Sequence, residues 1–297
     1  MKLEHLAHFD RTARLGSFAA AARAAHVDPS SVSRSVATLE AKLGVSLFVR
    51  NTRRLRLTEA GARFHADIVP LLDGLSDAAA RVQPGRLSGT VRITASATFA
   101  QLVLIDILAV FRAEHPDIRI DLRASDSRLD MIADGIDIAL RHGPLTDSAL
   151  QCRRLRSARY SLYAASDALA CHTPEDVAER PHLLFDLPGF RDGWTLVSGT
   201  TRTHVPARPA LTSDNAASLL RACEAGMGVA LLADWTAKGA LMAGTIRPAL
   251  PDWQVDMGSE ARGIWMLTPA QPYRSARVAA LMDYLVRRIG SEKPYPP

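Results

Sequence analysis

Four arginines fall within seven positions of the sequence, at Arg50, Arg53, Arg54 and Arg56. Guanidinium groups donate hydrogen bonds to phosphate oxygens, and they also enter narrow minor grooves of DNA. Two short strands are predicted around residues 50–54, at Leu47-Phe48-Val49 and at Leu55-Arg56-Leu57. We therefore expect a hairpin with a basic tip suited to a nucleic-acid backbone. A charge run is also common on an ordinary solvated surface, so the preceding segment decides between the two interpretations.

The preceding segment, residues 17–43, predicts two helices joined by a tight turn. Ser17 is suited to cap an alanine-rich helix, and Asp28 with Pro29 is suited to begin the second. In the second helix one buried stripe is predicted, at Val32, Val36, Leu39 and Leu43. The opposite face is small and polar, which fits a helix that enters a major groove, although an ordinary surface helix has the same pattern. The predicted DNA contacts are Ser30, Ser31, Ser33, Arg34 and Thr38, with Arg50, Arg53 and Arg54 of the hairpin.

Several segments of the sequence resemble one known protein family. The segment FAAAARAAHVDPSSVSRSVATLEAKLGVSLFVR and the following LTEAG resemble the DNA-binding domain of LysR-type transcriptional regulators. RLDMIADGIDIALRHG and TSDNAASLLRACEAGMGVALLA resemble the effector domain of the same family. The resemblance implies an α/β protein with a winged helix-turn-helix at 1–61, a long linker helix and hinge at 58–89, and a two-lobed effector domain of periplasmic-binding-protein type at 90–297. Lobe I would span about 90–160 and 269–297, and lobe II about 161–268.

The resemblance also implies partners. They are double-stranded promoter or operator DNA, a small-molecule effector, a second copy in a homodimer or homotetramer, and RNA polymerase. No cofactor and no membrane are expected, and the expected location is the bacterial cytoplasm at the nucleoid.

Composition agrees with this assignment. The chain has 36 Lys and Arg residues against 31 Asp and Glu residues. Residues 1–89 hold 13 of the basic and 8 of the acidic residues. The remainder therefore has 36 − 13 = 23 basic and 31 − 8 = 23 acidic residues. The whole positive excess therefore belongs to the predicted DNA-binding part. No apolar run reaches the roughly 18 residues of a membrane span, and no signal peptide is expected. Three widely separated cysteines favour a reducing compartment.

Helical periodicity predicts two elements around the head. Residues 3–14 form a first helix with Leu3, Leu6, Phe9 and Ala13 inward. A helix capped by Thr58 continues to about residue 83, with an apolar seam that pairing with a second copy would cover. Pro70 lies inside this helix, so we expect a kink or a division into two segments.

From residue 90 strands and helices alternate, which predicts a βαβαβ unit with a parallel sheet. The unit comprises strands at 90–95, 118–123 and 136–140, a helix at 100–113 with Leu102, Ile105, Leu108 and Phe111 inward, and a short helix at 129–134. A second set follows, with strands near 159–164, 183–186 and 228–233 and helices near 174–179 and 215–225. A strand at 263–268 and a helix at about 274–289 end the fold.

Ligands of open α/β sheets bind beyond the carboxyl ends of the strands, at helix N-termini. The residues at such places are Ser96, Thr98, Arg141, His142, Ser213 and Asn215. An arginine combined with helix N-termini favours an anionic group, so a small carboxylate or similar polar metabolite is the predicted effector. The same residues could instead be N-caps and a salt-bridge partner. His5 and His8 share a helix face but lack a third ligand, so no metal site is predicted.

Three other functions fit the sequence less well. No nucleophile, metal or phosphate-binding motif of an enzyme is present, and Gly226-Met227-Gly228 fits a turn better than a dinucleotide site. A transport solute-binding protein would need export and no DNA-binding head. A regulator that senses thiol oxidation remains the alternative, although Cys223 falls in the middle of a predicted helix, where a packing role is favoured.

Overall fold

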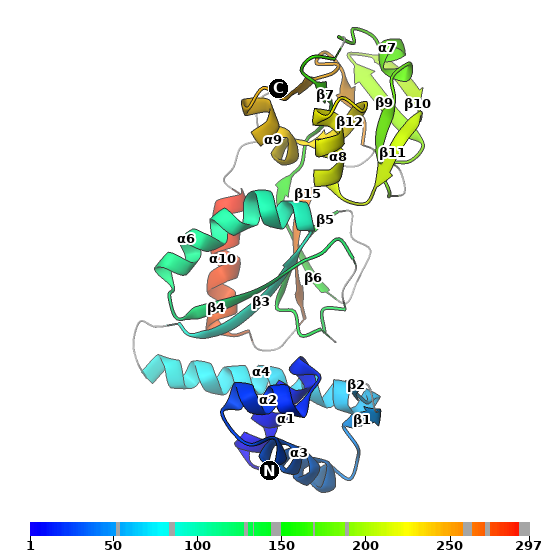
Figure 1. Cartoon of the computed structure of the whole chain (residues 1–297). Helices are drawn as coiled ribbons and strands as arrows, with labels where there is room; N and C mark the ends of the chain where they lie inside the picture. The colour runs from blue at the N-terminus through cyan, green and yellow to red at the C-terminus, as the bar shows by residue number, and fades with distance from the viewer. Residues whose placement is uncertain are drawn as a thin grey trace.

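The computed structural model describes residues 1–51, 54–82, 87–127, 130–132, 134–143, 150–168, 170–187, 190–257, 263–270 and 274–290. They form three successive units (Figure 1). An N-terminal head with a long helix lies at one end, lobe I lies in the middle, and lobe II lies at the other end. None of the described helices is long and apolar enough to cross a bilayer.

Three helices build the head: α1 (Leu3–Leu15), α2 (Phe18–Ala25) and α3 (Pro29–Leu43). As predicted, Ser17 caps α2, because its Oγ accepts a hydrogen bond from Ala20 N at 3.4 Å. Asp28 occupies the N-cap position of α3 without a side-chain hydrogen bond. The predicted inward stripes of α1 and α3 are confirmed at their central residues. They are wrong at one end of each helix: Leu3 and Leu43 are 51% and 38% exposed, because Leu3 is the first residue of α1 and Leu43 the last residue of α3.

The predicted hairpin is present. Strand β1 (Phe48–Asn51) pairs antiparallel with β2 (Arg54–Leu57), from Phe48 opposite Leu57 to Asn51 opposite Arg54. Glu40 ties the hairpin to α3, since its Oε1 accepts the N–H groups of Leu47 and Phe48 at 2.7 and 3.2 Å. The tip, residues 52–53, lies outside the described residues.

Helix α4 (Glu59–Val82) leaves the head, and Thr58 Oγ1 caps it by accepting from Gly61 N at 2.9 Å. It is one uninterrupted helix through Pro70, so the expected division into two segments is wrong; the lost N–H removes a single hydrogen bond, and the turns on both sides persist. Leu71 and Leu75 are 71% and 50% exposed on α4. Ile68 of the same seam is buried in the core of the head, so it is the part of the seam at Leu71 and Leu75 that is uncovered in a single chain.

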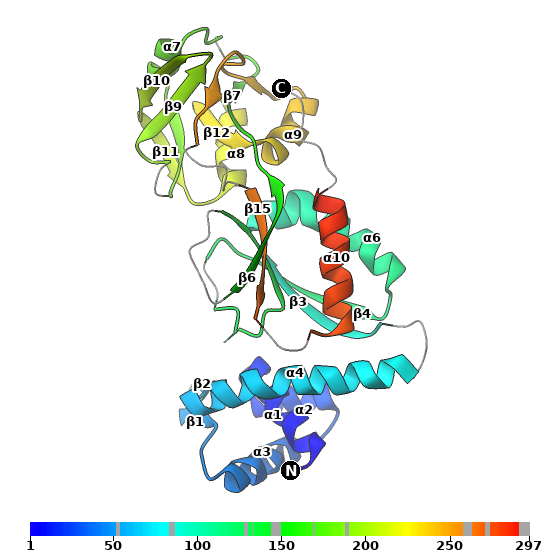
Figure 2. The same ribbon diagram turned by 180° about the vertical axis from the view of Figure 1, so that it is seen from behind.

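Lobe I contains a five-stranded sheet in the order β4-β3-β5-β15-β6. The predicted parallel unit is confirmed for β3 (Gly89–Ala95), β4 (Ile118–Ala124) and β5 (Ile138–His142). Strand β15 (Gly263–Pro269) is antiparallel to β5 and to β6 (Leu150–Ser157). Helices α6 (Ile105–Glu114) and α10 (Ala276–Gly290) lie on one face of this sheet and share its apolar core (Figure 2).

The helix after β3 departs from the predicted register. It begins with α5 (Ala97–Phe99), passes through a π-helical turn, η1 (Ala100–Leu104), and continues as α6. The predicted inward residues Leu102 and Ile105 are 41% and 49% exposed, whereas Leu104 is fully buried. A π-turn adds one residue to a helical turn and so rotates everything before it relative to everything after it.

Lobe II has two sheets. The larger has the order β11-β8-β12-β7-β13, and the smaller has the order β10-β9-β14. The strands are β7 (Tyr160–Ala165), β8 (His182–Phe185), β9 (Gly193–Ser198), β10 (Thr201–Pro206), β11 (Pro209–Ser213), β12 (Val229–Ala233), β13 (Ile246–Pro248) and β14 (Gln254–Val255). The helices are α7 (Pro174–Ala178), α8 (Ala216–Glu224) and α9 (Asp234–Met242). The predicted strands and helices of this region are confirmed; the smaller sheet, the edge strands β11 and β13 of the larger sheet, and α9 were not predicted.

Three predicted boundaries differ. Residues 131–132 and 134–135 form turns, and residue 130 is irregular, in place of the predicted helix at 129–134; residues 129 and 133 lie outside the described part of the chain. Strand β5 begins at Ile138 and includes Arg141 and His142, which were expected to follow it. Because β15 belongs to the sheet of lobe I, the chain has returned to lobe I by Gly263, earlier than the residue 268 that the resemblance implied.

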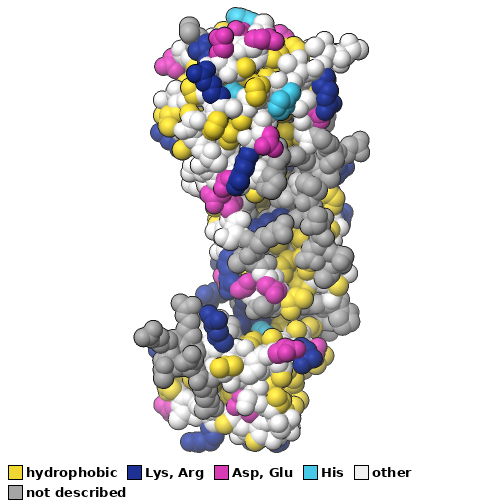
Figure 3. Space-filling view, turned by 90° about the vertical axis from the view of Figure 1, so that its right-hand side faces the viewer, with side chains coloured by type: hydrophobic (Ala, Val, Ile, Leu, Met, Phe, Trp, Pro, Cys, Tyr) yellow, Lys and Arg dark blue, Asp and Glu magenta, His cyan; other side chains and the backbone are white. Residues whose placement is uncertain are grey.

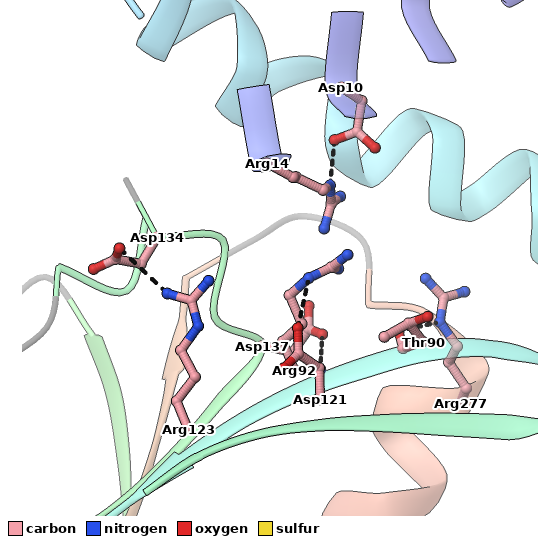
Figure 4. A network of polar contacts seen from close by, with 9 residues as sticks. All are labelled: Asp10, Arg14, Thr90, Arg92, Asp121, Arg123, Asp134, Asp137 and Arg277. Atoms are coloured by element: carbon pink, nitrogen blue, oxygen red, sulfur yellow. Dashed lines mark hydrogen bonds and ion pairs between the residues drawn. The ribbon is translucent and has the colours of Figure 1, made fainter. Parts of the chain in front are cut away.

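Polar side chains of the head and of lobe I face each other in Figure 4, where the dashed contacts lie within each unit. Arg14 of α1 donates to Asp10 at 2.5 Å, and Asp10 also pairs with His65 of α4 at 2.8 Å. Burial raises the pKa of Asp10, but the hydrogen bonds from His65 and Arg14 outweigh it, so that pKa is lower than usual. Burial lowers the pKa of Arg92 on β3, and the nearby positive charge of Arg14 lowers it further. Two cations thus face each other where the head meets lobe I.

Candidate functional site

The exposed face of α3 presents the predicted DNA-contacting residues. Ser30 and Arg34 are exposed, and Ser31, Ser33 and Thr38 are half-buried at its margins. Val32, Val36 and Leu39 are fully buried on the opposite side, which fixes this orientation. Thr38 Oγ1 donates to the carbonyl oxygen of Arg34 at 2.8 Å, so its proton is already used within the helix.

Two further residues hold α3 in place and were not predicted. Ser35 is buried, and its Oγ lies 3.0 Å from Nδ1 of His8 on α1. Glu40 connects the other end of α3 to the hairpin through the two backbone hydrogen bonds described above. Neither follows from apolar periodicity, because both are polar residues that form tertiary contacts.

The hairpin lies directly after α3 in the head (Figure 1). Its pairing places Arg50 opposite Leu55 and Asn51 opposite Arg54, so Arg50 and Arg54 flank the tip. Arg56 is exposed on β2. The side chains of Arg50 and Arg54 and the whole of Arg53 lie outside the described part of the chain, so their predicted DNA contacts remain predictions.

Five of the six predicted effector residues form hydrogen bonds across or beside the junction between the lobes. Thr98 Oγ1 of lobe I accepts from Ala217 N of α8 in lobe II at 3.1 Å. The Nδ2 of Asn215 donates to Asp126 of lobe I at 3.1 Å, while its Oδ1 caps α8 by accepting from Ser218 N at 3.1 Å. Ser213 Oγ accepts from Asn215 N at 3.1 Å, which shapes the turn before α8. Ser96 Oγ lies 3.2 Å from His142 Nε2.

His142 is enclosed by aromatic rings from both lobes. Its imidazole stacks on Trp235 of α9, with ring centroids 5.2 Å apart, and meets the edge of Phe99 at 6.0 Å. Burial lowers the pKa of His142 to about 4, so the ring is neutral at physiological pH. Trp235, only 8% exposed, joins the core of lobe I although it belongs to a helix of lobe II. The predicted ligand residue His142 therefore lies in the packing between the lobes.

Arg141 lies apart from His142, because successive side chains of β5 point to opposite faces of the sheet. Its guanidinium donates to Thr94 Oγ1 at 2.9 Å and to the carbonyl oxygen of Leu140 at 3.2 Å. Burial lowers the pKa of Arg141, and the negative charge of Asp126 opposes that shift. Among the described residues no carboxylate forms an ion pair with Arg141.

An ion pair near the lobe junction was not predicted. Arg156 of β6 in lobe I lies 2.5 Å from Asp234 at the start of α9, and the two side chains are 9% and 6% exposed. Removing one partner of such a buried pair leaves an uncompensated charge, which is strongly destabilising. Together with Trp235, this pair joins the lobes.

The buried cysteines have the properties of packing residues. Cys171 and Cys223 are 6% and 0% exposed, and Cys223 Sγ donates to the carbonyl oxygen of Tyr163 at 3.3 Å. Burial raises the pKa of Cys223 to about 12, which suppresses the reactive thiolate. Cys152 is exposed. The described residues contain no group of three or more potential metal ligands.

A winged helix-turn-helix joined by a long helix to a two-lobed α/β domain defines a ligand-controlled DNA-binding regulator. Comparison with known proteins agrees over the whole chain. Residues 3–62 match the model of bacterial regulatory helix-turn-helix proteins of the lysR family, and residues 84–290 match the LysR substrate binding domain.

Individual relatives agree with the family models. An HTH-type transcriptional regulator of Xanthomonas campestris pv. campestris is 30% identical over 97% of this chain and 85% of its own. The structure of CrgA, a LysR-type transcriptional regulator from Neisseria meningitidis, has a TM-score of 0.62 at 27% identity and covers 98% of this chain and 100% of its own. A full-length variant of OxyR from Pseudomonas aeruginosa, at 18% identity and a TM-score of 0.70, covers 100% of this chain and 99% of its own and shows the same fold. The chain belongs to the LysR family of transcriptional regulators, a family of regulators and not of enzymes.

Proposed function

We propose that α3 enters the major groove of operator DNA and that the hairpin holds the adjacent backbone or minor groove. The observation that supports this most strongly is the orientation of α3, with Ser30 and Arg34 exposed and its apolar stripe buried. Arg34 and Ser30, with Ser31, Ser33 and Thr38 at the margins, would contact base edges and nearby phosphates. Arg50, Arg53 and Arg54 would contact phosphates or a narrow minor groove.

A footprint on the DNA upstream of the gene for this protein, at two salt concentrations, tests the proposal. Inverted half-sites that stay protected at the higher salt would establish specific recognition. Weak, uniform protection that is lost at the higher salt would show only electrostatic attraction. Replacing Arg53 by Ala should weaken binding to every sequence and reduce the salt slope by about one phosphate contact.

For the effector, a small anionic metabolite bound between the lobes is supported best. The proposed contacts are Ser96, Thr98, Arg141, His142, Ser213 and Asn215. Arg141 supports an anion because it is partly buried and its hydrogen-bond acceptors among the described residues, Thr94 Oγ1 and the carbonyl oxygen of Leu140, are neutral. On the face in Figure 3, basic and acidic side chains are interspersed over lobe II. An individual charged side chain, and not a broad electrostatic field of one sign, would therefore select the ligand. A thermal-shift screen that responds to apolar compounds but to no organic acid would reject the anion.

The effector would act by binding one arrangement of the lobes more tightly, which shifts the relative placement of two DNA-binding heads. We place the DNA-binding domain at about 1–61 and the linker at 58–89, with α4 pairing two chains into a homodimer or homotetramer. A regulator of this kind acts on chromosomal DNA in the bacterial cytoplasm and contacts RNA polymerase at the promoter.

A further inference from the structure

One carboxylate joins the two lobes at their junction. Asp126 follows β4 of lobe I. Its Oδ1 accepts from Ala97 N at 3.1 Å, and its Oδ2 accepts from Asn215 Nδ2 at 3.1 Å. Ala97 belongs to lobe I and Asn215 to lobe II, so the two oxygens of a single side chain are shared between the lobes.

The surroundings of this bridge are ordered by further hydrogen bonds. Asn215 Oδ1 accepts from Ser218 N, which leaves the Nδ2 group directed at Asp126. The bond between Thr98 Oγ1 and Ala217 N joins the same two segments beside the bridge. A carboxylate bound by a backbone N–H and an amide N–H, with the cation Arg141 close enough to feel its charge, has the environment expected for an anionic ligand.

We propose that Asp126 is an internal carboxylate ligand that takes the place of an anionic effector between the lobes and holds the lobes together when no effector is bound. The inference deepens the proposed effector function and depends on it for its regulatory meaning. An anionic effector would then exchange with Asp126, taking over the two N–H donors while Asp126 turns into water.

The exposure of Asp126 makes this exchange feasible. The residue is exposed, so its carboxylate can be hydrated as soon as it leaves the two donors, and a soluble anion can approach. Hydrogen bonds in such a position contribute modestly to stability, which suits a reversible contact. The apparent affinity for an effector is reduced by the fraction of molecules in which Asp126 holds the position.

Chemical rescue tests the proposal in the full chain. Asp126→Ala removes the carboxylate and leaves space that formate can enter, so formate is the probe. Hydrogen exchange of the segments around Ala97 and Ala217, measured by mass spectrometry, reports the bridge. We expect roughly tenfold faster exchange of both segments in Asp126→Ala, in line with the loss of charge-assisted hydrogen bonds. Formate, but not chloride at equal ionic strength, should restore most of the protection.

Asp176→Ala is the matched control. Asp176 also accepts two backbone N–H groups, from His172 and Thr173, but it lies within lobe II and touches neither segment of the cleft. Its loss should leave exchange at Ala97 and Ala217 unchanged, with or without formate. If Asp126→Ala exchanged like the wild type, or if formate acted equally on all three proteins, Asp126 would be an ordinary loop residue and the proposal would be overturned.

The outcome is separable from that of the proposed function. Asp126 lies outside the head, so the wild-type footprint tests DNA recognition independently. If the wild type gave no footprint but formate rescued Asp126→Ala, the bridge between the lobes would be established and its role in regulation would be rejected. If both succeed, the footprint of Asp126→Ala should differ from that of the wild type in length or spacing, and formate should return it to the wild-type pattern; an unchanged footprint would contradict control of the heads by this bridge.

Discussion

The imidazole of His142 stacks almost parallel to the indole of Trp235, with their planes inclined by 10°. His142 comes from lobe I and Trp235 from lobe II, so this ring pair is part of the junction between the lobes. Protonation would place a positive charge among Phe99, Trp235 and the apolar core of lobe I. The low pKa of His142, about 4, reflects the free-energy cost of placing a charge in this buried position.

The first prediction concerns acid stability. Between pH 6.5 and about 4 the unfolded chain protonates His142 and the folded chain does not, so this residue makes stability fall as the pH falls through that window. From pH 7.5 to 5 the loss attributable to His142 should be roughly 2 kcal/mol. Urea unfolding of the wild type and His142→Gln at both pH values measures it. An equal pH dependence in the two proteins would reject it, and replacing the exposed His204 by Gln serves as the control.

The second prediction concerns Arg34. Arg34→Ala should weaken binding to the operator by about 1–3 kcal/mol while changing non-specific binding much less, because a bidentate contact to a base edge is lost. Fluorescence anisotropy with operator and scrambled DNA at one salt concentration measures both. Arg11→Ala removes the same charge from an exposed position on α1. If it lost as much operator preference as Arg34→Ala, bulk charge would explain the effect and our orientation of α3 would be wrong.

The third prediction concerns assembly through α4. Leu75→Glu places a charge on the exposed apolar seam, where burial of one leucine contributes about 1.5–3 kcal/mol per chain, so it should shift the protein toward monomers. Sedimentation velocity over a range of concentrations shows the shift. Leu15→Glu is the control, because Leu15 is similarly exposed, at 48% against 50%, but lies on α1. Unaltered assembly of Leu75→Glu would place the subunit interface elsewhere.

The fourth prediction concerns two helical glycines. A Cβ at Gly61 would lie 2.0 Å from the carbonyl oxygen of Leu47, so Gly61→Ala must displace the hairpin from α4 and should cost about 1–3 kcal/mol. Gly239 in α9 has nothing within 4 Å of its Cβ position, and Gly239→Ala should stabilise by about 0.5–1 kcal/mol. Thermal unfolding compares them. Equal effects of the two substitutions would contradict the close contact at Gly61.

Local chemistry made the head predictable from the sequence. Ser17, Pro29 and Thr58 mark helix starts by their own hydrogen bonds or ring geometry, and the apolar stripe of α3 requires no distant partner to be recognised. The register after β3 could not be predicted in the same way. The π-turn at Ala100–Leu104 has no residue signature, so helical periodicity alone does not reveal it.

The cleft residues were identified by position and not by role. Ser96, Thr98 and Asn215 were selected because strand ends and helix starts meet there, and they do form contacts at the cleft. Asp126, the partner of Asn215, and Trp235, which stacks on His142, were not predicted, since each is distant in sequence from its partner and neither belongs to a motif. The ion pair of Arg156 and Asp234, which are 78 positions apart, was not predicted for the same reason.

Lobe II begins after β6 and ends before β15, and these two strands are antiparallel neighbours, with Ser157 opposite Gly263. The two points at which the chain leaves and re-enters lobe I are therefore adjacent, as they are in a domain inserted into a host hairpin. A short turn could join β6 to β15 and leave the sheet of lobe I unbroken. Lobe II could therefore be replaced as a unit by another inserted domain, provided that the new domain supplies a partner for Arg156 and fills the space of Trp235.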